Sequence, residues 1–567
     1  MTPARRRTAA DLAVAAVPTL LVLGPLLVGG GFWLVGDMVF VPHQPWKSAW
    51  LGLDGSLPRA VPMDALISLA THVLPGSVVQ RLLLVGGFLA GGLGVGRLLR
   101  AHAWYARAAA IALLTWNPWV YERLLIGQWA ILLGYLLLPW VAIAALRIRA
   151  DSRDWSPAAG ALLASAVCSP SSGVMAVGVL AVLGLGRDRA AWWRVALLGV
   201  AANLTWAVPA LTAAATRIST DGVFAGFAAR AESGAGVLPS LLSLGGIWKT
   251  SILPAERTSA AVVLLSCVLA VVALVGLRSR SVPGERRRWA VLGALALGVA
   301  ALPAWSVGAD LEESLADVVP GLALLRDSHR FLAPLGLVLA VGAAGATTAL
   351  RARVRPGAGA LWSAVGLVVV APVLLLPSLA WGAAGELDRS AYPPAWEDVA
   401  QLVADGGTGG ATVVLPWAGS YRGYPWDHHR AVLDPAPRLL PGTVLVDDTV
   451  LLGDRAVPAE DPRVDAVRLA LADPDPAGAL RALGVRWVLL ERGMGSAEPP
   501  PGRVAYDAGG LTLVDLAAGG AVDRAPSVVE PDVPAWRRVA VGAGHAGCLF
   551  LGFLAFCRRR RHTSMRE

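Results

Sequence analysis

Lysine is nearly absent from this chain of 567 residues, which has 49 basic residues but only two lysines, Lys47 and Lys249. Cysteine is also scarce, and its four positions lie in or beside apolar segments: Cys168, Cys267, Cys548 and Cys557. So few scattered cysteines do not make a disulfide framework. We interpret them as small buried apolar side chains.

Charge is low as well, at 16% of residues against 55% hydrophobic residues. A soluble protein of this length could not bury that much apolar surface. The mean hydropathy of +0.58 and apolar runs of about 18 or more residues indicate transmembrane helices. The net charge of +9 does not indicate a nucleic-acid partner, because the arginines cluster in short gaps between apolar runs. That arrangement is the positive-inside pattern of membrane proteins.

Arginine clusters such as "RRR" at 5–7 and "RRRR" at 558–561 mark the cytoplasmic side, so the apolar runs predict about 12 spans with both termini in the cytoplasm. The spans are expected near 12–36, 78–97, 104–120, 129–147, 157–169, 173–186, 191–213, 259–277, 289–303, 331–350, 360–382 and 538–557. The composition, rich in Ala, Gly, Val and Arg, suggests a bacterium, and hence a multi-pass protein of its plasma membrane.

Residues 383–536 differ in kind from the rest, because they hold 22 of the 40 acidic residues and many prolines. Short β-like runs occur at 411–416, 485–490 and 511–515, with helical spacing at 463–472 and 476–483. The pattern predicts a small α/β domain. The topology places it outside the cytoplasm, between a transmembrane domain of residues 1–382 and a final helix with a basic tail at 537–567.

The stretch "WNPWVYERLLIGQW" at 116–129 carries Glu122 and Arg123 where lipid would penalise charge. The topology puts both residues at the outer membrane surface, where tryptophans suit the headgroup region. They are therefore either an interfacial ion pair or part of the lining of a polar cavity.

Other outer segments share that depth. Asp37 follows the first span directly and His43 comes six residues later; an aspartate there could take a proton from a sugar hydroxyl. Asp54 and Asp64 in the same loop are alternative candidates for this base. The simpler interpretation of Asp37 is that it only solvates the end of the helix.

Four further cationic or basic groups follow at this depth. Lys249 lies beside a tryptophan in "GGIWKTSILP", and Arg326, His329 and Arg330 lie in "LLRDSHRFLAP". Arginines suit a phosphate or pyrophosphate, whereas snorkelling and flanking charge are the alternatives. We predict that most of the residues Asp37, Glu122, Arg123, Lys249, His329 and Arg330 line one outer pocket with Asp37 near its centre.

Several chemistries are excluded by missing motifs. The chain has no P-loop, no dinucleotide fingerprint, no H-E-x-x-H, no paired C-x-x-C and no G-x-S-x-G. "WDHHR" at 426–430 is a weak metal motif, because adjacent histidines cannot point the same way on a strand. We assign no metal ligand and no certain cofactor, and leave a divalent cation open.

The segments "NPWVYERLLIGQW" and "RDSHRFL", with an acidic residue after the first span and an outer carboxy-terminal domain, resemble the GT-C superfamily of membrane glycosyltransferases. They look like those of actinobacterial arabinofuranosyltransferases. The resemblance implies transfer of a sugar from a polyprenyl-phosphate donor to a cell-envelope glycan or glycolipid at the outer face, with Asp37 as base. Several branches carry paired acidic residues here, whereas Met38 follows Asp37.

On this resemblance the acceptor attacks the anomeric carbon with inversion, while Arg123, His329 or Arg330 stabilises the leaving lipid phosphate. Two other classes stay open. A lipid or polysaccharide transporter would need a continuous polar track through the helices. A catalytically silent scaffold for envelope assembly would tolerate Asp37→Asn.

Overall fold

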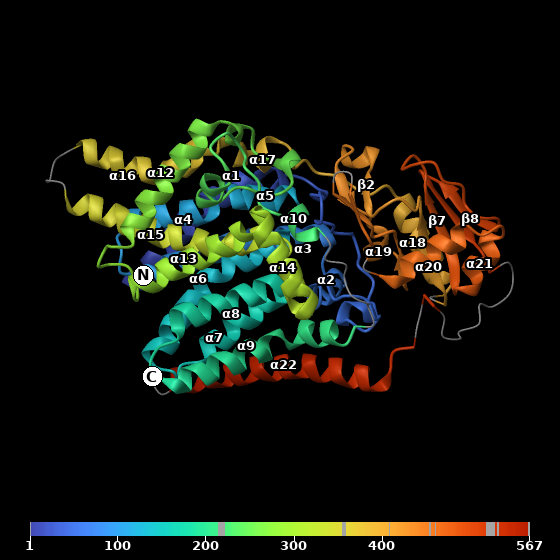
Figure 1. Ribbon diagram of the computed structural model, residues 1–567, viewed down its shortest axis with the longest axis horizontal. Coiled ribbons are helices and arrows are strands. Elements are labelled where there is room, and N and C mark those ends of the chain that lie inside the picture. The colour runs from blue at the N-terminus through green and yellow to red at the C-terminus, as the bar shows by residue number, and fades with distance from the viewer. Residues whose placement is uncertain are drawn as a thin grey trace.

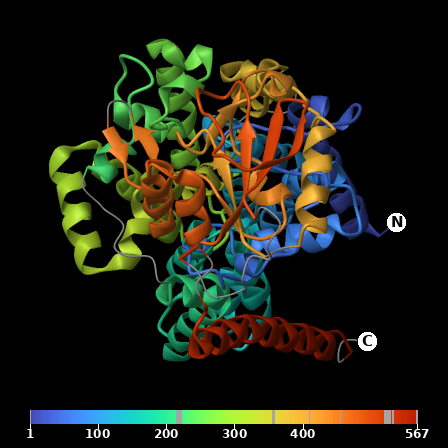
Figure 2. The same cartoon turned by 90° about the vertical axis from the view of Figure 1, so that its right-hand side faces the viewer.

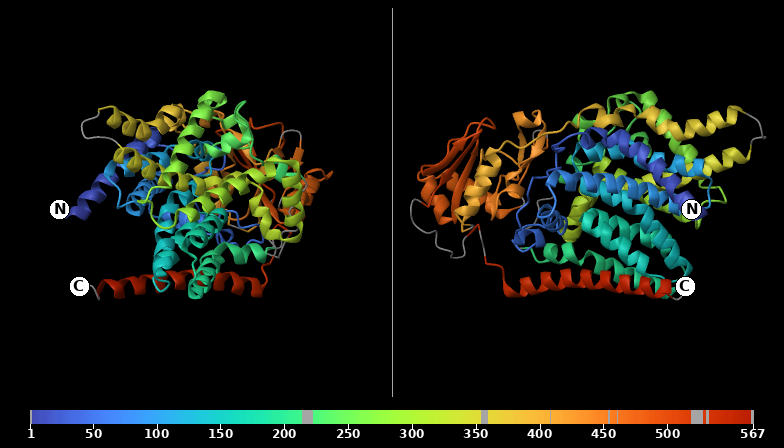
Figure 3. Two further views of the ribbon diagram at one scale, coloured as in Figure 1. Left: turned by 60° about the vertical axis from the view of Figure 1, so that its left-hand side comes forward. Right: turned by 180° about the vertical axis from the view of Figure 1, so that it is seen from behind.

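The computed structural model describes residues 2–213, 222–353, 359–407, 409–452, 455–459, 461–517, 528–529 and 532–564. It consists of a long helical body with a sheet-containing domain at one end (Figure 1). Both chain ends lie at the other end of the body, away from the sheet (Figures 1 and 3). Figure 2 looks onto the end that carries the sheet.

The helices of the body that matter below have the following bounds: α1 Pro3–Leu27, α2 Met63–Thr71, α3 Gly76–Leu98, α4 Trp104–Thr115, α5 Pro118–Leu125, α6 Trp129–Ala150, α7 Ser156–Cys168, α8 Pro170–Gly184, α9 Arg189–Leu211, α12 Ala260–Gly276, α13 Arg286–Ala301, α14 Ser306–Val318, α15 Ala333–Ala352, α16 Gly359–Leu375, α17 Ala380–Ala384 and α22 Ala535–Ser564. Figure 3 shows α22 running along one edge of the body, where it packs against α9 and α7.

Each of the 12 expected spans contains a helix, but the number of crossings is not confirmed. Within the described ranges, seven helices are long and apolar enough to span a membrane, or up to eight if one bent pair is a single span. The bent pair is Gly366–Leu375 with Pro377–Ala384, at an angle of 74°. Three helices of 10–17 residues, among them α7 and α8, are apolar but shorter.

The first predicted span, 12–36, was wrong in both bounds. The helix α1 begins at Pro3 and ends at Leu27, because the glycines at 29 and 31 have positive φ angles of 89° and 91° that do not continue a helix. The span expected at 104–120 also ends early. Asn117 begins the separate helix α5 by accepting a hydrogen bond from the Val120 amide at 3.1 Å.

The arginine-rich connections gather at the end of the body that carries the chain termini. Arg149 pairs with Glu285, and Arg558 of α22 donates to the Arg153 carbonyl at 2.9 Å. A polar cavity of about 610 Å³ lies there, lined in part by Arg149, Glu285 and Arg288. Segments that the sequence assigned to one side of the membrane therefore meet at one end.

The cysteines are free: Cys168 and Cys548 are buried, whereas Cys267 and Cys557 are half-buried.

The domain at the opposite end is a five-stranded sheet with the order β4-β1-β7-β9-β8. Its strands are β1 Ala411–Leu415, β4 Val444–Leu445, β7 Val485–Glu491, β8 Arg503–Ala508 and β9 Leu511–Asp515. Strands β4, β1 and β7 are parallel, while β9 runs antiparallel to β7 and β8. The three strands expected from the sequence are confirmed, as are the helices α20 Pro462–Leu471 and α21 Pro476–Ala482.

Both faces of β7 are covered, as its continuous apolar run predicted. Trp487 and Leu489 pack into the same core as α18 (Ala395–Asp405) and the helical body. Val488 and Leu490, on the alternate face, pack with residues of α20 and α21. The sheet domain therefore shares one of its two cores with the body.

A buried polar cluster holds the hairpin of β2 (Tyr421–Gly423) and β3 (Ala431–Leu433) to this sheet. The Arg422 guanidinium lies 2.8 Å from Glu491 and 3.5 Å from Asp434. The Tyr424 hydroxyl donates to Glu491 at 2.8 Å. Burial, together with the charge of Asp434, raises the pKa of Glu491 to about 8.

This cluster predicts a pH-dependent stability. The folded protein holds a proton on Glu491 that the unfolded chain releases, so the stabilisation is complete below the ordinary pKa of 4.5 and is lost as the pH rises through about 8. We expect the thermal midpoint in detergent to fall from about pH 6 to about pH 9. Glu491→Gln, which keeps the shape of the protonated acid, should flatten that fall. Glu498→Gln, at an exposed position, is the control; equal slopes in all three proteins would contradict the assignment.

Candidate functional site

Two glycines bring the first loop and the α5–α6 turn into close contact. A Cβ atom on Gly36 would lie 2.2 Å from the Ile126 carbonyl oxygen, and one on Gly127 would lie 2.1 Å from the Val35 carbonyl oxygen. Their φ angles are +52° and +81°. A side chain at either position would clash with the other loop, so only glycine allows the two loops to cross here. At the crossing the Asp37 amide donates to the Ile126 carbonyl at 3.0 Å.

This crossing places Asp37 beside Gln128. The Gln128 side-chain amide lies 3.5 Å from Asp37 Oδ2 and 3.4 Å from Asp327 Oδ2. Its carbonyl oxygen accepts a hydrogen bond from Arg123. Gln128 is buried, and it thereby connects the first loop, α5 and the segment before α15.

Arg123 is the centre of the cluster and is fully buried. Besides Gln128, its guanidinium contacts His329 Nδ1 at 2.6 Å and lies 3.7 Å from Asp327. It also stacks over the Trp119 ring, with 5.3 Å from Cζ to the ring centroid. A planar group with several donors suits this position, because a lysine ammonium could not reach all of these partners.

Asp327 joins a second arginine to the cluster. Arg330 Nε lies 2.7 Å from Asp327 Oδ2, and a quarter of its side chain is exposed. Burial acts to raise the pKa of Asp327, but the positive charges of Arg330 and Arg123 outweigh it and hold that pKa below its ordinary value. Asp327 therefore bridges the two guanidinium groups, of which only that of Arg330 is partly exposed.

Glu122 and His329 form the innermost part of the site. His329 Nε2 lies 3.4 Å from Glu122 Oε2 and 3.1 Å from the Gly245 carbonyl. Both side chains are fully buried. Through Gly245 the outer loop that contains Lys249 is attached to the same cluster.

That outer loop carries its own buried ion pair. Arg257 bonds Glu232 through two nitrogens, one of them at 3.1 Å, and donates to Ser243 Oγ at 2.8 Å. Neither side chain of the pair is exposed. The pair fixes residues 243–246, which carry the carbonyl that meets His329.

The sheet domain contributes a residue that the sequence did not indicate. The Tyr421 hydroxyl donates to Asp37 Oδ1 at 2.6 Å. The main chain makes a matching contact, because the Gly36 amide donates to Ala431 at 2.7 Å and the Leu433 amide donates to Gly36 at 2.9 Å. Asp37 therefore lies where the sheet domain meets the body.

The structure thus connects Asp37, Glu122, Arg123, His329 and Arg330 through one chain of contacts. It also corrects part of the expected set. Arg123 is enclosed and already occupied by protein partners. Lys249 is half-buried, and its side chain makes no polar contact within the described ranges of the chain, whereas its carbonyl accepts from the Ile252 amide at 3.3 Å. Arg326 stacks over Phe227 at 5.9 Å.

Two residues of the first loop lie outside this chain of contacts. His43 is exposed and bonds the Thr71 carbonyl at 3.1 Å. Asp54 accepts from Ser56 and lies 3.5 Å from Arg463 of the sheet domain. They were expected at the cavity because they share its depth, but the loop turns them toward α2 and the sheet domain instead.

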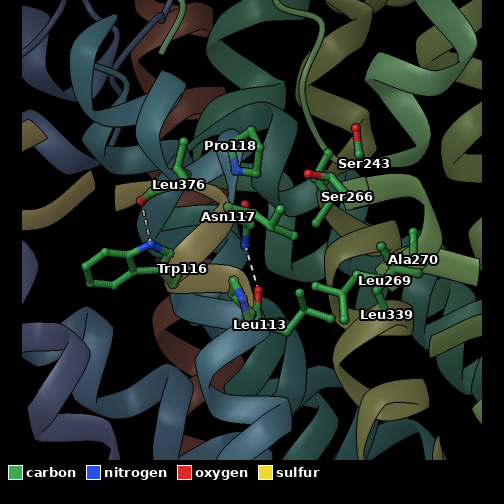
Figure 4. Close-up of a pocket in the computed structure, with 13 residues that line it drawn as sticks. Leu113, Trp116, Asn117, Pro118, Ser243, Ser266, Leu269, Ala270, Leu339 and Leu376 are labelled. Atoms are coloured by element: carbon green, nitrogen blue, oxygen red, sulfur yellow. Dashed lines mark hydrogen bonds between the residues drawn. The ribbon is translucent and has the colours of Figure 1, made fainter. Parts of the chain in front are cut away.

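An apolar pocket lies next to the cluster, between α4, α12, α15 and α16 (Figure 4). The close-up shows Trp116 bonded to the Leu376 carbonyl and Asn117 bonded to Leu113, at 2.8 and 2.9 Å. Ser243 and Leu244, which precede the carbonyl that meets His329, line the same pocket. The pocket has a volume of only about 30 Å³, enough for a few water molecules at most, so it has no room for a hydrocarbon chain.

Across the part of the chain that the structure describes, no group of three His, Cys, Asp or Glu side chains is arranged to hold a metal ion. His428 and His429 of the "WDHHR" motif have positive φ angles in a turn and bond to main-chain carbonyls.

The fold of this chain is similar to that of solved structures. A structure of the arabinofuranosyltransferase AftD from Mycobacteria aligns with 92% of this chain at a TM-score of 0.57 and 18% identity. A mutant of the same protein aligns with 92% at 0.57 and 19% identity. The fold is of the GT-C type. The chain is a multi-pass membrane protein that spans 40% of the length of that enzyme. No family model and no curated protein matches the sequence.

Proposed function

We propose that the chain is a membrane glycosyltransferase that moves a sugar from a polyprenyl-phosphate donor to a cell-envelope glycan or glycolipid. The single observation that carries the proposal is the contact chain from Asp37 through Gln128 to Arg123, Asp327 and Arg330. It holds a carboxylate and a half-buried guanidinium at the same end of the body. A base and an anion-binding group at one place are what sugar transfer from a lipid phosphate requires.

The proposed roles follow from how exposed each side chain is. Asp37 is half-buried and takes the proton of the acceptor hydroxyl as the oxygen attacks the anomeric carbon. Arg330 is partly exposed and meets the leaving phosphate, with Lys249 as the second cation. Arg123, His329 and Gln128 are buried, and they hold Asp37 and Arg330 in position relative to each other. The bond between the anomeric carbon and the phosphate oxygen breaks as the new glycosidic bond forms, and the configuration at the anomeric carbon is inverted.

The fold neighbour narrows the choice of substrate. Because AftD is an arabinofuranosyltransferase, we choose polyprenyl-phospho-arabinofuranose as the first donor. The sheet domain, which lies next to Asp37, is the side from which a glycan acceptor would approach.

The experiment is a donor panel with purified protein in detergent. Radiolabelled polyprenyl-phosphate sugars are incubated with synthetic alkyl arabinofuranosides, and products are separated by chromatography. We expect transfer from the arabinofuranose donor. Counter-flow of intact donor across proteoliposomes without transfer would support the transporter instead.

The direction of insertion is a separate prediction. Since the arginine-rich connections around Arg149, Arg153 and Arg558 meet at one end and such clusters stay in the cytoplasm, single cysteines at positions 150, 283 and 353 should be shielded from an impermeant maleimide in intact cells. Cysteines at 230, 318 and 450 should be labelled. Shielding at 450 would put the sheet domain in the cytoplasm and would refute an outer-face reaction.

A further inference from the structure

The strand β2 presents two neighbouring side chains to opposite sides. Tyr421 faces the first loop and donates to Asp37 at 2.6 Å. Arg422 is buried in the sheet domain against Glu491 and Asp434. Alternation along a strand explains the opposite directions. Figure 1 shows β2 on the side of the sheet domain that faces the body.

The strand itself is fixed, but the tyrosine side chain is not enclosed. The hairpin is held to the first loop by the two main-chain hydrogen bonds at Gly36 and to the sheet by Arg422. The Tyr421 side chain is 42% exposed. Its hydroxyl can therefore leave Asp37 by side-chain rotation, without any movement of the domain.

Both oxygens of Asp37 are occupied by donors. Oδ1 accepts from Tyr421 at 2.6 Å, and Oδ2 lies 3.5 Å from the Gln128 amide. A carboxylate takes a proton from a hydroxyl group best through an oxygen that no other donor holds. Gln128 is buried and also holds Arg123, so Tyr421 is the partner that can be replaced.

We propose that Tyr421 occupies the acceptor position on Asp37 in the resting protein, so that the glycan hydroxyl has to displace it and water is kept from reacting. This inference rests on the proposed transferase function. It makes Tyr421 a positioning residue that decides between acceptor and water, and it locates the acceptor site between Asp37 and β2.

The side reaction that Tyr421 suppresses is hydrolysis of the donor. A water oxygen would bond the anomeric carbon while its proton passes to Asp37. The bond from that carbon to the phosphate oxygen would break, giving free sugar and polyprenyl phosphate. Without the tyrosine hydroxyl, a water molecule takes the place on Oδ1 and is already positioned for this attack.

The first test compares hydrolysis with transfer in Tyr421→Phe. Labelled polyprenyl-phospho-arabinofuranose is incubated without and with an alkyl arabinofuranoside. Losing a hydrogen bond to a charged group should raise hydrolysis about tenfold, with a lower KM for the arabinofuranoside and a similar kcat. Tyr392→Phe is the matched control, because Tyr392 donates to the Phe40 carbonyl at 3.0 Å across the same interface. Its hydrolysis should equal that of the wild type.

A second test examines the contact without any turnover. Burial, and after it the charge of Asp37, raises the pKa of Tyr421, which slows nitration because tetranitromethane attacks the phenolate. Asp37→Asn should speed nitration of Tyr421 several-fold, measured by mass spectrometry of its peptide. An unchanged nitration rate would overturn the contact.

The outcomes separate the two proposals. An active wild type whose hydrolysis is unaffected by Tyr421→Phe, or equally raised by Tyr392→Phe, refutes the role of Tyr421 and leaves the transferase standing. A wild type that neither transfers nor hydrolyses any donor of the panel refutes the transferase and the role of Tyr421 together.

Discussion

Asp37→Asn should lower the rate of sugar transfer by about 10²–10⁴-fold, the range expected when a general base is lost. Asparagine keeps the size of the side chain and can still contact Tyr421 and Gln128, so the thermal midpoint should stay near that of the wild type. The loss should fall on kcat, since in the proposed mechanism the donor phosphate meets Arg330 and not Asp37. The measurement is initial rate against donor concentration, with circular dichroism to confirm folding.

The matched control is Asp54→Asn, in the same loop. Asp54 pairs with Arg463 and Ser56, outside the chain of contacts that contains Asp37. We expect at most a few-fold change in transfer for Asp54→Asn. Equal activity of Asp37→Asn and wild type would favour the silent scaffold, and a loss confined to Asp54→Asn would move the base to the rival carboxylate.

Arg257→Met should destabilise the protein by about 3–5 kcal/mol, because it leaves the buried carboxylate of Glu232 without its partner. Neither group of the pair is exposed to solvent, so water cannot replace the lost guanidinium. The free energy of unfolding would be taken from denaturant titration in mixed micelles. Adding Glu232→Gln to Arg257→Met should recover part of the loss, since the unpaired charge is then removed.

The surface pair Arg149–Glu285 provides the comparison. Both of its side chains are partly exposed, at 23% and 56%, and exposed pairs contribute little to stability. Glu285→Gln should therefore be nearly silent in the same titration. If Arg257→Met were as mild as Glu285→Gln, the outer loop would not be held by its buried pair, and the position of Gly245 against His329 would need another cause.

The sequence predicted the depth of the charged residues better than their partners. Arginine clusters and apolar runs were enough to put Glu122, Arg123, His329 and Arg330 at one level, and the structure joins them. The depth of a residue along the membrane normal does not give its position around the helical body. His43 was therefore expected at the same site, but it lies elsewhere.

Three residues of the site received no role from the sequence because their signal depends on packing. Gln128 and Asp327 are ordinary polar residues until the crossing of Gly36 and Gly127 brings the loops together. Tyr421 is 384 residues from Asp37 in the chain. A glycine directly before Asp37 and another directly before Gln128 were the available signal, since glycine marks close backbone approach.

The strands of the sheet domain were predictable for the opposite reason. Their apolar runs are local and are bounded by glycine, proline and aspartate, so 411–416, 485–490 and 511–515 were found from the sequence. The strand β4, of two residues, and the hairpin β2–β3 are too short to carry such a pattern. It is this hairpin that reaches the site.

The central claim is that the cluster around Asp37 and Arg330 binds a lipid-linked sugar, and the most direct measurement is a cryo-electron microscopy structure with a phosphonate analogue of polyprenyl-phospho-arabinofuranose. The account predicts the phosphonate in hydrogen-bonding contact with Arg330 and the anomeric carbon next to Asp37. A phosphonate bound instead among Arg149 and Arg288, in the polar cavity at the other end of the body, would contradict it.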